Sequence, residues 1–180
     1  MVLLVTTHAA AQAPTRVLDL AGRPVNPLLV EPGSAATVLL FTTADCPISN
    51  RYAPEIQRLE SRFGQQVRFV LVFPVPTDTA AIVRRHVQKF AYSSEAVRDT
   101  AQELVKRTGV TISPEVAVFD AKAQLVYRGR IDDRFVELGV ERPHPTVRNL
   151  ERALEAVTTG RTVAVRETQA VGCILADLVK

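Results

Sequence analysis

Short apolar runs alternate with amphipathic stretches along most of the chain. The runs TVLLFT (37–42) and VRFVLVF (67–73) are continuous and of strand length, which predicts two buried central strands. Between them, apolar residues recur at spacings of three and four, the period of a helix: Ile48, Tyr52, Ile56, Leu59 and Phe63. We therefore expect a helix over 48–63 that Pro54 kinks and Gly64 ends.

The remaining pattern predicts a small N-terminal hairpin over 17–25, helices over 79–90, 97–107 and 146–158, and strands over 115–119 and 124–127. We expect Thr77 or Asp78 to cap the helix over 79–90, and Gly109 to end the helix over 97–107. Strand–helix units followed by a hairpin and a last helix predict an α/β fold. Its central sheet should be mixed, with parallel first strands, an antiparallel closing hairpin and flanking helices.

Composition narrows the class of protein. The chain has 180 residues, 47% hydrophobic and 23% charged, which suits one domain with a substantial core. Its net charge of +3 is small and spread out, without a Lys/Arg run, so nothing indicates a nucleic-acid partner. No stretch approaches the ~18 uncharged apolar residues of a membrane span. The sequence does not indicate an oligomeric state.

The first thirteen residues, MVLLVTTHAAAQA, differ from the rest. They are apolar and end in a small-x-small pattern before Pro14, as the end of a secretory signal does, although a charged n-region is missing. We expect an extracytoplasmic protein, periplasmic or secreted, with an apolar and poorly ordered N-terminus as the alternative. The predicted organisation is a signal segment (1–13), a domain (14–160) and a C-terminal extension (161–180) that carries Cys173.

Candidate chemistry centres on Cys46, which directly follows the first central strand. Pro47 suits the first position of a helix, so the Cys46 sulfur should lie at a helix N-terminus. The partial positive charge there lowers a thiol pKa, whereas the neighbouring Asp45 carboxylate opposes a thiolate. Cys46 is therefore either a reactive thiolate or an inert buried thiol.

The second cysteine, Cys173, lies 127 residues after Cys46. It is a resolving thiol, a packed core residue or half of a lasting bridge to Cys46. In an oxidising compartment such a bridge would stabilise the fold by about 4–5 kcal/mol, if geometry permits.

Three marks together resemble the thioredoxin-like superfamily over about residues 17–158. They are the Cys46-Pro47 pair at the helix start, Pro54 eight residues after Cys46, and Pro114 in TISPEVAVFD before the third core strand. Thr43, three residues before Cys46, and the segments DCPISN and YRGRIDDR are similar to the redoxin, alkyl hydroperoxide reductase/thiol-specific antioxidant (peroxiredoxin-like) branch.

This resemblance implies roles for several residues. Cys46 would be the nucleophile, and the Thr43 hydroxyl would donate a hydrogen bond to its sulfur or to a bound oxygen. Pro114 would be cis and lie beside Cys46, with Ser113 and Pro47 completing the surface that contacts an extended substrate.

The chain also departs from the family pattern. Ser49 occupies the place of the second cysteine of the thioredoxin motif, and Asp45 that of the usual tryptophan. Pro114 takes the position of the peroxidase arginine, which leaves Arg128 and Arg130 as the nearest replacements.

We therefore predict a thiol-dependent oxidoreductase, working by disulfide exchange or peroxide reduction, with Cys46 as nucleophile and Cys173 as possible resolving thiol. Its partners would be a protein disulfide or a peroxide and an external thiol donor, and no cofactor is expected. A non-catalytic binding module and a copper carrier are the alternatives. His86 and His144 lack ligand spacing and are interpreted as a solvated helix residue and a loop residue, so no metal site is predicted. The pair Asp132-Asp133 is interpreted as part of a charged surface loop.

Overall fold

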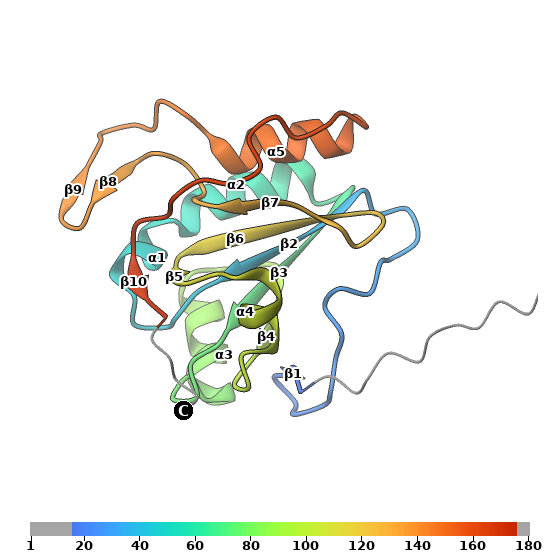
Figure 1. Cartoon of the computed structure of the whole chain (residues 1–180). Helices are drawn as coiled ribbons and strands as arrows, with labels where there is room; N and C mark the ends of the chain where they lie inside the picture. The colour runs from blue at the N-terminus through green and yellow to red at the C-terminus, as the bar shows by residue number, and fades with distance from the viewer. Residues whose placement is uncertain (1–15, 176–180) are drawn as a thin grey trace, which may run out of the picture.

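The computed structural model describes residues 16–175, and a six-stranded mixed sheet forms its centre (Figure 1). The sheet order is β1-β4-β3-β2-β6-β7, in which β2 pairs parallel with β3 and antiparallel with β6. Its strands are β1 (Leu18–Asp19), β2 (Ala36–Phe41), β3 (Val67–Phe73), β4 (Glu95–Arg98), β6 (Glu115–Asp120) and β7 (Leu125–Gly129). The predicted α/β class with a mixed sheet is confirmed.

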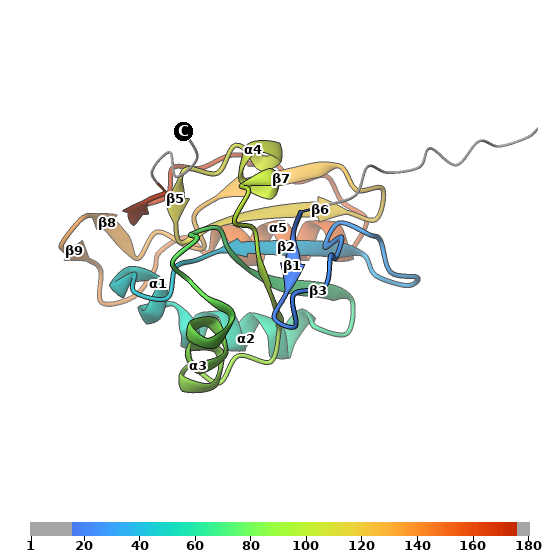
Figure 2. The same cartoon turned by 90° about the horizontal axis from the view of Figure 1, so that it is seen from below.

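Helices cover both faces of this sheet. They are α1 (Pro47–Arg51), α2 (Ala53–Phe63), α3 (Ala80–Lys89), α4 (Glu103–Thr108) and α5 (Asn149–Thr158). Because side chains alternate along β2, Val38 and Leu40 pack with α2, α3 and α5, whereas Leu39 and Phe41 face the α4 side. Figure 2 shows α4 on the side of the sheet opposite α2 and α3. Both faces of β2 are therefore buried, which explains why Thr37 is its only polar residue.

Two small sheets stand apart from the central one. The strand β8 (Phe135–Glu137) pairs with β9 (Val140–Glu141), and β5 (Ile112–Ser113) pairs antiparallel with β10 (Cys173–Ile174). Figure 1 shows β10, near the red end of the chain, beside β5 and the start of α1. The C-terminal extension therefore returns to the end of the sheet at which α1 begins.

On its way to β10 the extension runs along β7. The Arg128 amide donates to the Arg166 carbonyl over 2.9 Å, and the Thr168 amide donates to the Arg128 carbonyl over 3.1 Å. Gly129 makes this approach possible, because a Cβ at that position would lie 2.3 Å from the Thr168 carbonyl oxygen. These contacts anchor the extension before it turns towards β5.

The predicted helix over 97–107 is wrong in its first half. Val97 belongs to β4, where it pairs with Val72 and Asp19, and α4 begins only at Glu103. Buried Asp99 separates the two elements, because its carboxylate accepts hydrogen bonds from the first amides of α4. A strand of four residues is too short for its sequence to distinguish it from the first turn of a helix.

Other boundaries also differ from prediction. The helix expected over 48–63 is two helices that meet at Tyr52, with Pro54 at the start of α2 instead of at a kink. Thr79 caps α3 by accepting from the Ile82 amide, not Thr77 or Asp78. The last helix begins at Asn149 instead of residue 146.

None of the helices within residues 16–175 is long and apolar enough to cross a membrane. The predicted signal segment, residues 1–13, lies outside the described residues and stays a prediction.

Candidate thiol site

Cys46 lies where β2 gives way to α1. It occupies the N-cap position, in extended backbone geometry, and Pro47 is the first helical residue. The Cys46 amide donates to the Thr43 carbonyl over 3.3 Å, which closes the turn between strand and helix. The side chain is only 1% exposed. The predicted placement of this thiol at a helix N-terminus is confirmed.

The second element of the site is the cis peptide between Ser113 and Pro114, as expected. The Cys46 thiol donates to the Ser113 carbonyl oxygen over 3.2 Å. The hydroxyls of Ser49 and Ser113 share a hydrogen bond of 2.9 Å. Ser49, which replaces the usual second cysteine, therefore links α1 to β5.

The C-terminal extension supplies the third element. In the register of β10 on β5, Cys173 stands opposite Ser113, whose carbonyl contacts the Cys46 sulfur. The Cys173 thiol is close enough to Cys46 to shift the pKa of that thiol, and both cysteines are free. The fold thus brings together two thiols that lie far apart in the sequence.

The surroundings shift the pKa values of Cys46 and Cys173 in opposite directions. Burial alone raises the pKa of Cys46, but hydrogen bonding from Cys173 and Ser49 outweighs it and lowers the pKa below the ordinary value. The Ser49 backbone amide and hydroxyl both contribute, although the sulfur does not form a regular N-cap hydrogen bond.

Cys173 shifts in the opposite sense. Burial, its hydrogen bond to Cys46 and the negative charges of Cys46 and Asp45 raise the pKa of Cys173 to about 12. When one proton has left the pair, the thiolate therefore sits on Cys46 and the proton stays on Cys173.

Two buried polar side chains hold the loop that precedes Cys46. The Asp78 carboxylate accepts from the Ala44 amide over 3.2 Å, and His86 hydrogen-bonds with the Ala44 backbone. Burial raises the pKa of Asp78 and lowers that of His86. Neither residue was assigned to the site from sequence, because both lie more than thirty positions from Cys46.

The interpretation of His86 as a solvated residue is wrong. Its side chain is 5% exposed and lies among the rings of Phe73, Phe90 and Tyr92. The aromatic residues at positions 90 and 92 were the available signal. His144 lies in a loop, as expected, and is exposed. No group of three potential ligands among the described residues could hold a metal ion.

The surface-loop interpretation of Asp132 and Asp133 is also wrong, because both are buried. Asp132 accepts a 2.7 Å hydrogen bond from the Tyr52 hydroxyl. Asp133 accepts from the amides of Thr146 and Val147 and so holds the segment before α5. Both carboxylates therefore hold neighbouring loops in place through buried hydrogen bonds.

Some residues expected near the sulfur make other contacts. Thr43 is buried and contributes its carbonyl to the turn, and within residues 16–175 its hydroxyl forms no hydrogen bond with Cys46. Arg128 donates to the Gly109 carbonyl over 2.7 Å and pairs with Glu167, and Arg130 donates to Asn149. The described contacts therefore bring neither arginine to the thiols.

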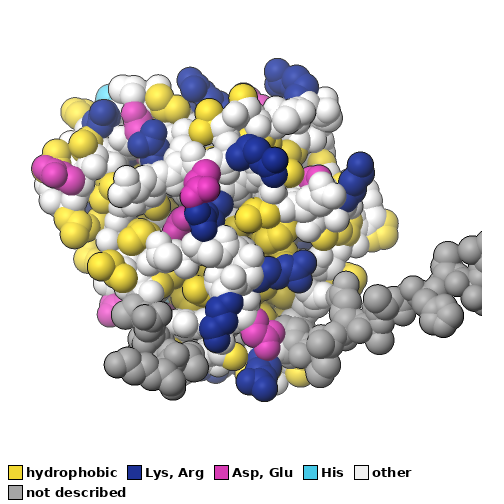
Figure 3. Space-filling view, viewed as in Figure 1, with side chains coloured by type: hydrophobic (Ala, Val, Ile, Leu, Met, Phe, Trp, Pro, Cys, Tyr) yellow, Lys and Arg dark blue, Asp and Glu magenta, His cyan; other side chains and the backbone are white. Residues whose placement is uncertain are grey.

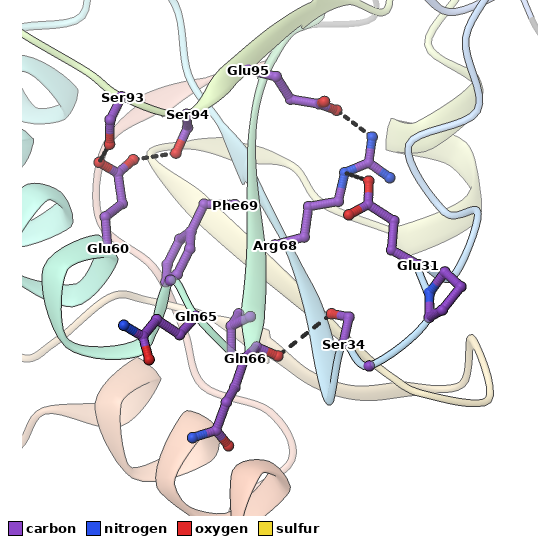
Figure 4. Close-up of a pocket in the computed structure, with 14 residues that line it drawn as sticks. Glu31, Ser34, Glu60, Gln65, Gln66, Arg68, Phe69, Ser93, Ser94 and Glu95 are labelled. Carbon is purple, nitrogen blue, oxygen red and sulfur yellow. Dashed lines mark hydrogen bonds and ion pairs between the residues drawn. The ribbon is translucent and has the colours of Figure 1, made fainter.

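A cavity of about 570 Å³ lies at the other end of the sheet (Figure 4). It is lined by residues next to the first positions of β2 and β3, and its charged side chains already have partners. Glu60 accepts from Ser93, and Arg68 pairs with Glu95 over 2.6 Å. The thiol site has no part in this cavity.

Together these elements define a thioredoxin-like fold with a buried thiol at the start of its first helix. No protein-family model matches the chain, and no curated protein sequence matches it.

Solved structures, however, are similar. A hypothetical protein from Sinorhizobium meliloti 1021 is 22% identical, with a TM-score of 0.76, over 91% of this chain and 90% of that one. An uncharacterized conserved protein from Geobacillus kaustophilus is 25% identical, with a TM-score of 0.74, over 91% and 88%. A secreted Mycobacterium tuberculosis disulfide oxidoreductase homologous to E. coli DsbE is 18% identical, with a TM-score of 0.54, over 79% and 93%. At 22% and 18% identity, the likenesses to the Sinorhizobium and Mycobacterium proteins support the fold alone.

Proposed function

We propose that this protein is a thiol-disulfide oxidoreductase in which Cys46 is the nucleophile and Cys173 is the resolving thiol. The observation that carries the proposal is the pair of free thiols, Cys46 at the start of α1 and Cys173 on β10. The pKa of Cys46 is lowered, and that of Cys173 is raised. A thiolate at Cys46 is the attacking species that disulfide exchange needs. Cys173 stays protonated and therefore does not attack until Cys46 has formed its mixed disulfide with the substrate.

The reaction takes two exchanges. The Cys46 thiolate attacks one sulfur of a substrate disulfide, forms a mixed disulfide and releases the other substrate sulfur as a thiolate, which takes up a proton. Cys173 then loses its proton, attacks the Cys46 sulfur and releases the second substrate thiol. The substrate disulfide has been reduced to two thiols, and the two protein thiols have been oxidised to one disulfide. An external dithiol regenerates the protein.

Disulfide exchange is the better supported chemistry for this site. Peroxide reduction, as in the peroxiredoxin-like branch, calls for a cation beside the attacking sulfur, and the described contacts of Arg128 and Arg130 lie elsewhere. The similar structure from Mycobacterium tuberculosis is likewise named a disulfide oxidoreductase. An export signal at residues 1–13 would deliver such a pair to an oxidising compartment, which is part of the same proposal.

Substitution of each cysteine tests the assignment. Cys46→Ser should abolish turnover of a small disulfide and of a protein disulfide, whereas Cys173→Ser should accumulate a mixed disulfide at Cys46 that mass spectrometry detects. The rate of hydroperoxide reduction is measured alongside the rates for the two disulfides. Turnover that survives Cys46→Ser would rule out the proposal, and faster reduction of hydroperoxide than of either disulfide would replace it with peroxide chemistry. An unreactive Cys46 with an ordinary pKa would favour a binding module.

A further inference from the structure

The C-terminal strand β10 occupies the part of the site that an extended substrate would use. The edge of β5 presents the backbone of Ile112 and Ser113 beside the Cys46 sulfur. An extended polypeptide binds such an edge by adding a strand through main-chain hydrogen bonds. In this structure that strand is already present, and the residue opposite Ser113 is Cys173.

Close packing seats β10 on this edge. A Cβ at Gly172 would lie 2.1 Å from the Ser113 carbonyl oxygen and 2.7 Å from its carbonyl carbon, so only glycine allows the tail to lie this near. After the two paired residues, the Leu175 amide donates to the Thr111 carbonyl over 2.8 Å, and the Leu175 side chain is buried. The neighbouring Ile174 side chain is 78% exposed. The strand is thus held by its backbone, a glycine contact and one apolar side chain.

The pairing of β10 with β5 is nevertheless short enough for β10 to dissociate. The β10–β5 ladder pairs only two residues, whereas the extension is anchored separately on β7 through Arg166 and Thr168. Loss of the ladder therefore leaves the tail tethered within reach, and a tethered strand returns at a high effective concentration.

Apolar surface lies next to this seat. The hairpin of β8 and β9 exposes Val136, Leu138 and Val140. A cavity of about 380 Å³ between hairpin and tail is lined by Val136 and Val171 together with the charged side chains of Arg130, Asp133, Glu137 and Arg142. Figure 3 shows hydrophobic side chains on this side of the molecule, over β8, β9 and β10. A polypeptide that added a strand to β5 would meet this surface, whereas a small disulfide would not.

We propose that β10 is a tethered occupant of the polypeptide-binding edge of β5. A protein disulfide then reaches buried Cys46 only when the β10 backbone leaves, whereas a small disulfide needs only the side chain at residue 173 to turn aside. This inference rests on the proposed function and adds its regulation. After a protein substrate has formed its mixed disulfide with Cys46, the return of β10 brings Cys173 to that bond and displaces the substrate strand in the same movement.

The test measures only the first exchange, in full-length Cys173→Ser protein. Two probes release the same thionitrobenzoate: dithionitrobenzoate itself, and a short extended peptide whose single cysteine carries that group. In each case the Cys46 thiolate forms a disulfide with the retained half and releases thionitrobenzoate. Gly172→Ala should unseat β10, because its Cβ meets backbone atoms that cannot move aside. Leu175→Pro should do the same by removing the amide that donates to Thr111.

Unseating should raise the rate for the peptide relative to that for dithionitrobenzoate. If β10 fills its seat about nine-tenths of the time, the ratio of the two rates rises about tenfold, because the binding-competent fraction rises by that factor. The matched control is Ala164→Val, which enlarges an exposed position of the same extension and should leave the ratio unchanged.

Hydrogen exchange over 171–175 reports whether β10 has left. The proposal is overturned if a variant speeds that exchange without changing the ratio, or if both variants leave the exchange unchanged. A failure of the proposed function looks different: neither probe would release thionitrobenzoate faster than it does with the Cys46→Ser, Cys173→Ser double variant, which has no thiol, whatever the state of the tail.

Discussion

Oxidation of the two cysteines to a disulfide should make the folded protein markedly more stable. Cys46 and Cys173 are 127 residues apart in the sequence, and their thiols already interact in the reduced protein. In the chain-entropy treatment, closing a loop of this length lowers the entropy of the unfolded chain and stabilises the fold by about 5 kcal/mol at 25 °C. Because β10 is already seated, little of this gain should be lost to rearrangement of the fold.

Urea unfolding of the oxidised and the reduced protein measures this difference. With a slope of about 2.5 kcal/mol per M, the oxidised midpoint should lie about 2 M higher. By thermodynamic linkage, folding should also make the pair more reducing by about 100 mV than the same two cysteines in the unfolded chain, since 30 mV corresponds to about 1.4 kcal/mol. Equilibration with a thiol buffer, with and without urea, gives this second value independently.

Cys173→Ser is the control, because its unfolding midpoint should not depend on oxidation. The reasoning is refuted if mass spectrometry shows that the bridge forms, but the urea midpoint of the oxidised protein equals that of the reduced protein and the reduction potential of the folded protein equals that of the unfolded chain. Such a result would mean that closing the bridge strains β10 by as much as the loop closure stabilises.

Two other predictions concern groups around Cys46. Ser49→Ala removes a hydroxyl that favours the thiolate, so the pKa of Cys46 should rise and its alkylation rate near neutral pH should fall; an unchanged pH profile of alkylation would contradict this role. Burial lowers the pKa of His86, so the unfolded chain binds its proton more tightly than the folded protein does. The stability contributed by neutral His86 is therefore complete above the unfolded pKa of about 6.5 and is lost as the pH falls below it. The drop in urea midpoint between about pH 7 and pH 5 should shrink in His86→Phe and persist in His144→Gln, which changes an exposed residue; an equal drop in both variants would exclude His86 as its source.

The sequence predicted the elements whose signals are local. The strands β2 and β3 stand out because both of their faces are buried, and the site around Cys46 could be located from a thiol and a proline at the end of such a strand. The cis Ser113-Pro114 peptide was expected from the family resemblance, not from any local pattern. Local apolar periodicity and helix-start chemistry thus sufficed for the centre of the fold and for one half of the site.

Features that depend on contacts between distant segments were missed. Nothing near Val97 distinguishes a strand from a helix, because its strand partners are Val72 and Asp19. His86 and Asp132 look like surface residues until the rings around the imidazole and the Tyr52 hydroxyl are in place. Polar residues that hydrogen-bond within buried turns are of the same types as polar residues on the surface. Their burial can therefore be known only once the fold is assembled.

The contacts of Cys173 connect the proposed chemistry with the proposed regulation. In this chain Ser49 occupies the helix position at which a second thiol would lie permanently beside Cys46, and the partner thiol comes instead from a strand that pairs through only two residues. A resolving thiol on a fixed helix is always within reach, whereas one on β10 is present only when the edge of β5 is closed to another strand. The second exchange and the binding of a polypeptide therefore exclude each other at Ser113. The stability of one short ladder should thus set both the access of protein substrates and the lifetime of their mixed disulfides, and a variant that weakens it should increase both together.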